Sequence, residues 1–397
     1  MTLISPKIEY SNETWPRFDA DETAAVLNVL QSGKVNYWTG TESREFECEY
    51  AQYLGVKHAI ALHNGTAALE LALYAFGIGD GAEVITTPRT FIASASAAVL
   101  RGAIPIMADV DPISQNITAN SIRKVITPKT KAIIVVHLAG YPCDMDSIMD
   151  LAQEHHLIVI EDCAQAQGAF YKGKPVGSIG DAGAFSFCQD KIITTGGEGG
   201  LLALNDASVW AKAWAYKDHG KSFDAVYNKK HAPGFKWLHE SFGTNWRMLE
   251  VQAAIGRIQL RKLPKWVEQR RANAAVLTEA FSKLPALRVT RVPNDLYHSY
   301  YKYYVFVRNK QLKAGWSRDR IMNEVTSLGM PCFSGSCSEI YLEKAFVDAG
   351  FGLEQRLPSA KILGETSLMF LVHPTLSVDD MQAVTDVVNF VMKRATK

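Results

Sequence analysis

Short apolar runs alternate with helix-like segments along the first two-thirds of the chain. The apolar runs occupy residues 59–62, 83–86, 104–109, 131–137, 157–161, 182–187 and 200–204. Between them lie helix-like segments at 66–76, 92–101, 121–126 and 145–155. Strands that alternate with helices in this way pair side by side in parallel, with the helices packed on both faces. The sequence therefore predicts an α/β fold built on a mainly parallel sheet.

The last third has a different pattern. A long helical stretch runs from Trp246 to about Leu284 and should be broken at Pro264. Strand-like runs at 303–308 and 368–373 and helix-like runs at 318–328 and 378–393 follow it. Because 397 residues are too many for one ordinary core, we expect two domains. We place a large domain with the N-terminal segment at 1–250 and a smaller α+β domain at 251–397.

The composition argues against several classes of partner. With 42 basic and 41 acidic residues, the chain has no basic excess to hold nucleic acid or an anionic membrane. No apolar run approaches the length of a transmembrane helix. Residues 1–10 lack the basic and apolar regions of a secretory signal, and the six cysteines lack zinc-ligand spacing. We expect a cytoplasmic protein without a metal site, whose partners are small molecules and protein surfaces.

Lys191 is the first candidate for chemistry. It follows an apolar strand-like run and precedes the glycine-rich segment 196–200. A lysine beside a buried strand end suits a Schiff base with an aldehyde, although it could simply extend its amine to the surface. Asp162 ends another predicted strand, at the sheet edge where such folds bind ligands. A lysine paired with an aspartate for the pyridinium nitrogen is what pyridoxal phosphate requires. Asp162 could instead cap the following helix.

A predicted strand–turn–helix offers a phosphate site. Gly65 would let the backbone approach a ligand closely, and a helix that begins at Thr66 presents free N–H groups. An ordinary helix cap is the commoner explanation of this pattern. Ser186 could add a hydroxyl to the phosphate. The chain lacks the Gly-x-Gly-x-x-Gly motif, so the sequence gives little support to a dinucleotide site.

Two further side chains could contact a pyridine ring. Gln165, three residues after Asp162, could donate a hydrogen bond to the phenolic oxygen of the cofactor. Phe91 follows Pro88 after a predicted strand and could stack on the ring, although a phenylalanine in the core is the commoner case.

In this order, the motifs resemble those of the DegT/DnrJ/EryC1/StrS family of sugar aminotransferases, which are fold-type I pyridoxal-phosphate enzymes. The resemblance covers nearly the whole chain. Its main motifs are Asn64-Gly65-Thr66-Ala67-Ala68-Leu69, Pro88-Arg89-Thr90-Phe91-Ile92-Ala93, Glu161-Asp162-Cys163-Ala164-Gln165, Ser186-Phe187 through Lys191, and Gly243-Thr244-Asn245-Trp246-Arg247-Met248.

This resemblance implies further roles. Thr66, Ala67 and Ser186 should contact the cofactor phosphate, and Phe91 should stack on the ring. Asn245 should reach the phosphate in a neighbouring subunit, which implies a homodimer with active sites at the interface. Family members aminate a keto group on a nucleotide-linked deoxysugar, usually with glutamate as donor and pyridoxamine 5'-phosphate as intermediate. The aminosugar then enters a surface polysaccharide, such as lipopolysaccharide O-antigen, or an antibiotic.

Four residues are candidates for substrate binding. His219 could contact sugar hydroxyls or a diphosphate, and Arg247 could bind a carboxylate or a diphosphate. The alternative for His219 is an exposed loop histidine that contacts no substrate, and the alternative for Arg247 is a structural ion pair. Trp38 could shape a pocket or pack the N-terminal segment, and Ser334 lies in a segment that contacts substrate in the family.

Two rival functions stay open. The first is a dehydratase on the same fold; such family members carry histidine at the lysine position, so Lys191 favours transamination. The second is a sensor or regulatory protein that keeps the fold without turnover.

Overall fold

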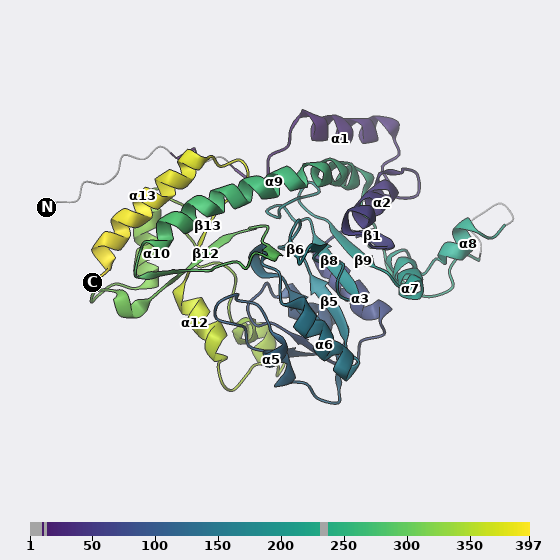
Figure 1. The fold of residues 1–397 in the computed structure, drawn as a ribbon. Helices are drawn as coiled ribbons and strands as arrows, with labels where there is room; N and C mark the ends of the chain where they lie inside the picture. Colours follow the sequence, from purple (N-terminus) through teal and green to yellow (C-terminus); the bar gives the residue numbers. More distant parts are fainter. Residues whose placement is uncertain (1–9, 12–13, 231–236) are drawn as a thin grey trace.

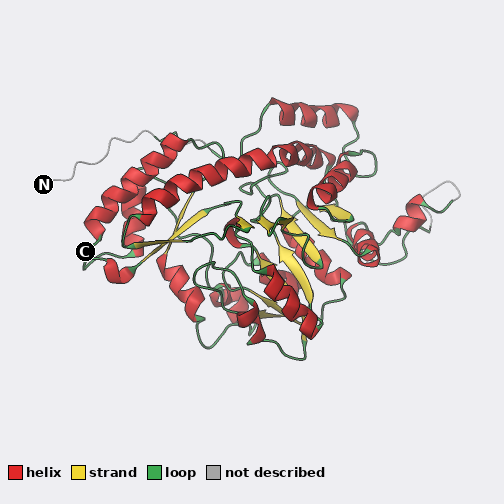
Figure 2. Cartoon of the chain, viewed as in Figure 1, coloured by secondary structure: helices red, strands yellow, loops and turns green. Residues whose placement is uncertain are grey.

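The computed structural model describes residues 10–11, 14–230 and 237–397. The expectation that residues 1–10 contain no secretory signal falls almost wholly outside this part of the chain. None of the helices in the described residues is both long enough and apolar enough to cross a membrane. Figure 1 gives the element labels, and Figure 2 separates helices from strands.

A seven-stranded sheet with the order β1-β9-β8-β5-β4-β2-β3 forms the centre of the larger domain. Of its strands, only β9 runs antiparallel to its neighbours, so the sheet is mainly parallel, as predicted. The strands are β1 His58–Leu62, β2 Glu83–Thr86, β3 Ile104–Met107, β4 Thr130–Val136, β5 Ile158–Asp162, β8 Ala182–Ser186 and β9 Gly200–Leu204.

Helices cover both faces of this sheet. One face packs on α3 Gly65–Ala75, α4 Ala93–Leu100 and α7 Ala207–Lys217. The other face packs on α2 Glu42–Leu54, α5 Ala119–Arg123, α6 Met145–His155 and the first half of α9 Glu250–Ser282. Helix α1 Ala20–Ser32 lies along the outer side of α9, as Figure 1 shows. Short strands β6 Phe170–Tyr171, β7 Lys174–Pro175 and β11 Leu296–Tyr297 form a separate small sheet.

The smaller domain is built on an antiparallel sheet with the order β10-β12-β13. Its core lies between this sheet and the helices α9, α10 and α13. The remaining elements of this part of the chain are β10 Leu287–Val289, β12 Tyr303–Val307, α10 Arg318–Ser327, α11 Lys344–Asp348, α12 Pro358–Thr366, β13 Ser367–Phe370 and α13 Val378–Ala395.

Helix α9 corrects one expectation, because it runs without a break through Pro264. A proline inside a helix costs about 3 kcal/mol through a lost hydrogen bond and a steric clash. The helix packs against α1, α2 and α13, and Leu263 and Val267 on either side of the proline are buried in the core. This packing offsets the local cost.

The two hydrophobic cores divide helix α9 between them. Ala253 and Leu263 belong to the core of the larger domain, whereas Leu277 and Phe281 belong to that of the smaller one. The helix therefore serves as a rigid connection between the domains, visible as the long ribbon across Figure 1. The boundary that we predict near residue 250 coincides with the start of this helix and stays a prediction.

The segment 217–241 contains the short helix α8 Phe223–Tyr227. Figure 1 shows α8 projecting away from the central sheet. Residues 231–236 of this segment lie outside the described part of the chain.

Candidate functional site

A cavity of about 690 Å³ lies at the carboxyl ends of the parallel strands. Strands β1, β5 and β8 end at Leu62, Asp162 and Ser186, so the residues that follow them meet at the same edge of the sheet. Tyr301 and the segment 333–336 close the cavity from the smaller domain. The site therefore depends on the docking of two domains.

The first turn of α3 forms one wall of this cavity. Asn64 caps the helix, and its Oδ1 accepts a hydrogen bond of 2.8 Å from the N–H of Ala67. The N–H groups of Gly65 and Thr66 have no partner among the described residues, as expected for a helix start. A Cβ atom at Gly65 would lie only 2.6 Å from Cβ of Ser186. Glycine is therefore required for the helix start to approach the end of β8 this closely.

This arrangement suits a phosphate. Two backbone N–H groups at a helix N-terminus and the Ser186 hydroxyl all face the same cavity, and the helix dipole favours negative charge there. Ala67 was also expected to contact the phosphate, but its N–H already donates a hydrogen bond to Asn64.

Asp162 is buried at the end of β5, with 6% of its surface exposed. Ser94 donates a hydrogen bond of 2.7 Å to Oδ2, and Thr90 lies 2.9 Å from the Ser94 hydroxyl. The N–H of Ala164 contributes a bond of 3.1 Å to Oδ1. Two donors hold the carboxylate in place, and it can still accept a hydrogen bond from a ring nitrogen.

Lys191 lies in the loop after β8 and also lines the cavity. Its carbonyl accepts a hydrogen bond of 2.7 Å from the indole N–H of Trp15, which fixes the backbone. Its Nζ lies 5.1 Å from the centre of the Tyr301 ring. The loop returns to the sheet through Gly196 and Gly197, whose positive φ angles of 86° and 120° favour glycine. Lys191 and Asp162 therefore line the same cavity.

Gln165 and Phe91 also line the cavity. Oε1 of Gln165 accepts a hydrogen bond of 2.9 Å from the N–H of Ala139, which leaves its Nε2 free to donate toward a ligand oxygen. Phe91 is 68% exposed. A phenylalanine that exposed is no core residue, and its ring is available for stacking.

The smaller domain contributes side chains that the sequence analysis missed. Tyr301, Lys302 and Tyr304 line the cavity, and the Tyr301 hydroxyl donates to Asp190. Lys302 lies 3.6 Å from Asp190, and its burial lowers the pKa of its ammonium group. Two features of the sequence could have indicated these side chains: the aromatic-rich run Tyr297–Tyr304 and the charged residue Asp190 next to Lys191.

Six expected residues lie outside the set that lines this cavity, and one of them, Ala67, is buried in α3. Asn245 and His219 are exposed, and Ser334 is exposed beside the lining residues Phe333 and Gly335. Trp38 packs its ring on Tyr227, at an angle of 20° and a distance of 6.4 Å. Arg247 forms an ion pair of 2.5 Å with buried Asp218.

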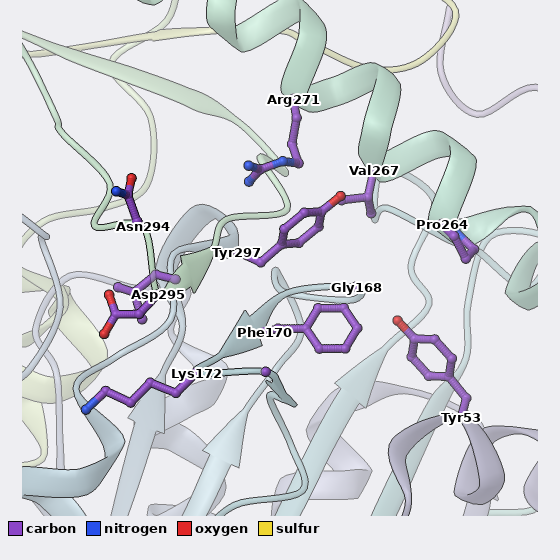
Figure 3. A pocket seen from close by; sticks show the side chains of 12 residues that line it. Tyr53, Gly168, Phe170, Lys172, Pro264, Val267, Arg271, Asn294, Asp295 and Tyr297 are labelled. Carbon is purple, nitrogen blue, oxygen red and sulfur yellow. The ribbon is translucent and has the colours of Figure 1, made fainter.

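A second cavity, of about 540 Å³, shares no lining residue with the first. Figure 3 shows its aromatic wall, with the rings of Phe170 and Tyr297 and the hydroxyl of Tyr53 facing inward from different elements. The guanidinium of Arg271 lies 3.9 Å from the centre of the Tyr297 ring, and its Nη1 donates to the carbonyl of His298. Its cation is thus already paired with protein groups.

The main cavity fits pyridoxal phosphate on the chemistry of its donors. It offers a glycine-lined cradle for the phosphate, a buried carboxylate for the ring nitrogen, an amide for the phenolic oxygen and an amine for the aldehyde.

Comparison with known proteins gives a consistent result. Residues 16–389 match the family model of the DegT/DnrJ/EryC1/StrS aminotransferase family. The chain is 35% identical over 396 residues to the spore coat polysaccharide biosynthesis protein SpsC of Bacillus subtilis, covering 99% of this chain and 100% of that protein. It is 38% identical over 318 residues to the GDP-perosamine synthase of Caulobacter vibrioides, covering 79% and 81%. The solved structure of an aminotransferase from Psychrobacter cryohalolentis is 57% identical, with a TM-score of 0.94 and coverage of 96% and 98%.

Proposed function

Because this chain belongs to the DegT/DnrJ/EryC1/StrS aminotransferase family, we propose that it transfers an amino group from glutamate to the keto group of a nucleotide-linked deoxysugar. Its cofactor is pyridoxal 5'-phosphate, on which enzymes of this family depend. The observation that carries the proposal is the position of Lys191 and Asp162 on one cavity, together with the phosphate cradle at Gly65.

Each lining residue has a defined task in holding the cofactor. The N–H groups of Gly65 and Thr66 and the hydroxyl of Ser186 bind the phosphate. Asp162 keeps the ring nitrogen protonated, and Gln165 donates to the phenolic oxygen. Phe91 stacks on one face of the ring. Asn245 is proposed to complete the phosphate site of a neighbouring subunit.

Lys191 moves the proton in each half of the reaction. Bound pyridoxal phosphate supplies the electron sink for the pair released when a proton leaves the carbon that bears nitrogen. The amine of Lys191 takes this proton from the glutamate carbon and later delivers a proton to the sugar carbon. Trp15 holds the backbone carbonyl of Lys191, which fixes the point from which the side chain of Lys191 extends.

The names of two relatives support a sugar as the acceptor of the amino group. One relative is a GDP-perosamine synthase and another belongs to spore coat polysaccharide synthesis. We therefore propose a nucleotide-activated keto-deoxysugar as acceptor, and a surface polysaccharide such as O-antigen, or an antibiotic, as the destination of the aminosugar. The cytoplasm is the proposed location.

A homodimer is proposed because apolar side chains next to Asn245 are exposed. Phe242 is 97% exposed and Trp237 is 89% exposed. Cores of protein interfaces are enriched in such aromatic residues. If a second copy of the chain covers these side chains, we propose that Asn245 reaches the active site of that second copy.

The decisive experiment uses ¹⁵N-labelled glutamate with a panel of nucleotide-linked keto-sugars, followed by NMR of the sugar product. Transfer of ¹⁵N to C3 or C4 of the sugar is expected, and Lys191→Arg should abolish it. A sugar product that has lost water without gaining nitrogen would instead identify a dehydratase. Binding of the nucleotide-sugar without any conversion of glutamate would identify a regulatory protein.

A further inference from the structure

A smaller cavity, of about 290 Å³, opens beside Lys191. Asp190, Tyr301, Lys302 and Leu371 line both this side cavity and the main one, so the two cavities adjoin. The rest of its wall comes from the N-terminal segment, from α9 and from the residues after β13.

Arg270 is the most unusual residue of this side cavity. It lies on α9 and only 1% of its surface is exposed. Its Nη1 donates to the carbonyl of Tyr301 at 3.3 Å, whereas Nε and Nη2 have no hydrogen-bond partner among the described residues. Burial lowers the pKa of Arg270 to about 9. A buried guanidinium with two free donors is costly unless something pairs with it.

The side cavity has more positive than negative charge. Arg270 and Lys302 face a single carboxylate, that of Asp190, which already accepts from Tyr301 and lies 3.6 Å from Lys302. His373 adds no charge near neutral pH, because burial lowers its pKa to about 3. One further carboxylate would balance the two cations, and the free N–H groups of Arg270 form the fork that binds a carboxylate with two hydrogen bonds.

Trp15 closes the side cavity from above. Its ring lies 5.1 Å from the Arg270 guanidinium and stacks on His373, with an angle of 22° between the planes. The same indole donates to the carbonyl of Lys191. The aromatic wall excludes water from the cation, which strengthens its attraction for a carboxylate.

We propose that this side cavity binds the side-chain carboxylate of a dicarboxylic amino donor, with Arg270 and Lys302 selecting glutamate over monocarboxylic amino acids. The proposal rests on the proposed aminotransferase function and assigns a specificity site to it.

Tyr301 lies beside both amines. Nζ of Lys191 and Nζ of Lys302 lie 5.1 Å and 4.6 Å from the centre of the same Tyr301 ring. In this proposal the reacting carbon of the donor would lie beside Lys191, and its side-chain carboxylate would lie beside Arg270 and Lys302 in the side cavity. Glutamate carries a second carboxylate three bonds beyond its reacting carbon, whereas alanine has no second carboxylate to place in the side cavity.

The first test measures binding without turnover. Glutarate, a five-carbon dicarboxylate without an amine, is titrated into the holoenzyme by calorimetry, with butyrate as the monocarboxylate comparison. In Arg270→Met the affinity for glutarate should fall about 10- to 100-fold, the usual loss for a charge-assisted hydrogen bond, and butyrate binding should hardly change. Lys302→Met gives a second variant at a partly exposed position.

Arg271→Met is the matched control. It alters the next residue of the same helix, which faces the separate cavity of Figure 3. Glutarate affinity in this variant should equal that of the wild-type enzyme. Equal affinity in Arg270→Met as well, with the variant folded, would overturn the proposal.

The second test separates the two halves of the reaction. Single-turnover rates with glutamate and with L-alanine give the preference for the dicarboxylic donor, which should fall about 10- to 100-fold in Arg270→Met. The sugar half-reaction should keep its rate. A loss confined to the sugar half would assign the cavity to a carboxylate on the sugar and refute our proposal. If even the wild-type enzyme fails to convert glutamate, the proposed function fails, while the glutarate titration still reports on the cavity.

Discussion

Replacing Gly65 by alanine tests the phosphate cradle with a single methyl group. The new Cβ would lie 2.6 Å from Cβ, 3.1 Å from Cα and 3.2 Å from Oγ of Ser186. Carbon atoms pack at about 3.5–4.0 Å, so the helix start and the end of β8 must separate by about 1 Å. This displacement moves the Ser186 hydroxyl and the first N–H groups of α3 relative to each other, and these are the groups proposed to bind phosphate.

The change should affect cofactor binding more than stability. Overpacking of this kind costs about 1–3 kcal/mol, and alanine in place of glycine in a helix returns up to about 1 kcal/mol. The melting temperature of Gly65→Ala without cofactor should therefore fall by a few degrees at most. The loss of one hydrogen bond to a charged phosphate costs about 1.5–3 kcal/mol, which raises the Kd for pyridoxal phosphate about 10- to 100-fold.

The assay removes the cofactor and titrates it back, with tryptophan fluorescence as the signal. Gly352→Ala is the control, because its methyl group would meet Val347 at an ordinary contact distance of 3.4 Å. Ser186→Gly removes the atom that the new methyl group strikes, so Gly65→Ala should weaken binding little further in that background. Wild-type affinity in Gly65→Ala, or an equal loss in both backgrounds, would refute the reasoning.

Three other predictions concern Asp162, Phe91 and Glu161. Asp162→Asn should lower kcat/KM about 100-fold or more in steady-state kinetics, with little change in melting temperature, because it removes the charge that faces the ring nitrogen. Phe91→Ala should weaken cofactor binding up to about 10-fold by the same titration and change stability by less than about 0.5 kcal/mol, because the ring is exposed. Burial alone would raise the pKa of Glu161, but hydrogen bonds from His137 and backbone N–H groups hold it below its usual value. The Glu161 carboxylate therefore stabilises the fold above about pH 4.3, and this contribution is lost as the pH falls. Denaturation measured over this pH range should show the loss, and Glu161→Gln should flatten the dependence of the unfolding free energy on pH.

The sequence predicted the parts of the site that depend on local pattern. Each apolar run became a strand, and parallel strands bring their carboxyl ends to one edge of the sheet. For that reason Asp162, Ser186 and Gly65 could be placed together although more than a hundred residues separate the outermost two. Lys191 was found because a glycine-rich turn follows it closely.

The contributions of the smaller domain could not be predicted in the same way. Tyr304 lies on β12 and Tyr301 lies in the segment just before it, and no periodicity in the chain predicts that either residue reaches this cavity. Pro264 illustrates the same limit: its local effect is to break a helix, yet packing on both sides of the proline keeps α9 continuous.

Arg270 departs from the usual exposed position of an arginine in a helix, and we relate this departure to its proposed role in binding the amino donor. In a helix, an arginine is expected on the solvated face, and its neighbour Arg271 indeed pairs with groups at the edge of a separate cavity. Arg270 instead points its cation into the side cavity beside Lys191, from the stretch of α9 between its two buried halves. Nη1 of Arg270 donates to the carbonyl of Tyr301, which ties the guanidinium to a residue beside Lys191. A rigidly placed, buried cation attracts a carboxylate without having to reorganise, and this is the property that a site needs in order to choose between amino donors of similar size.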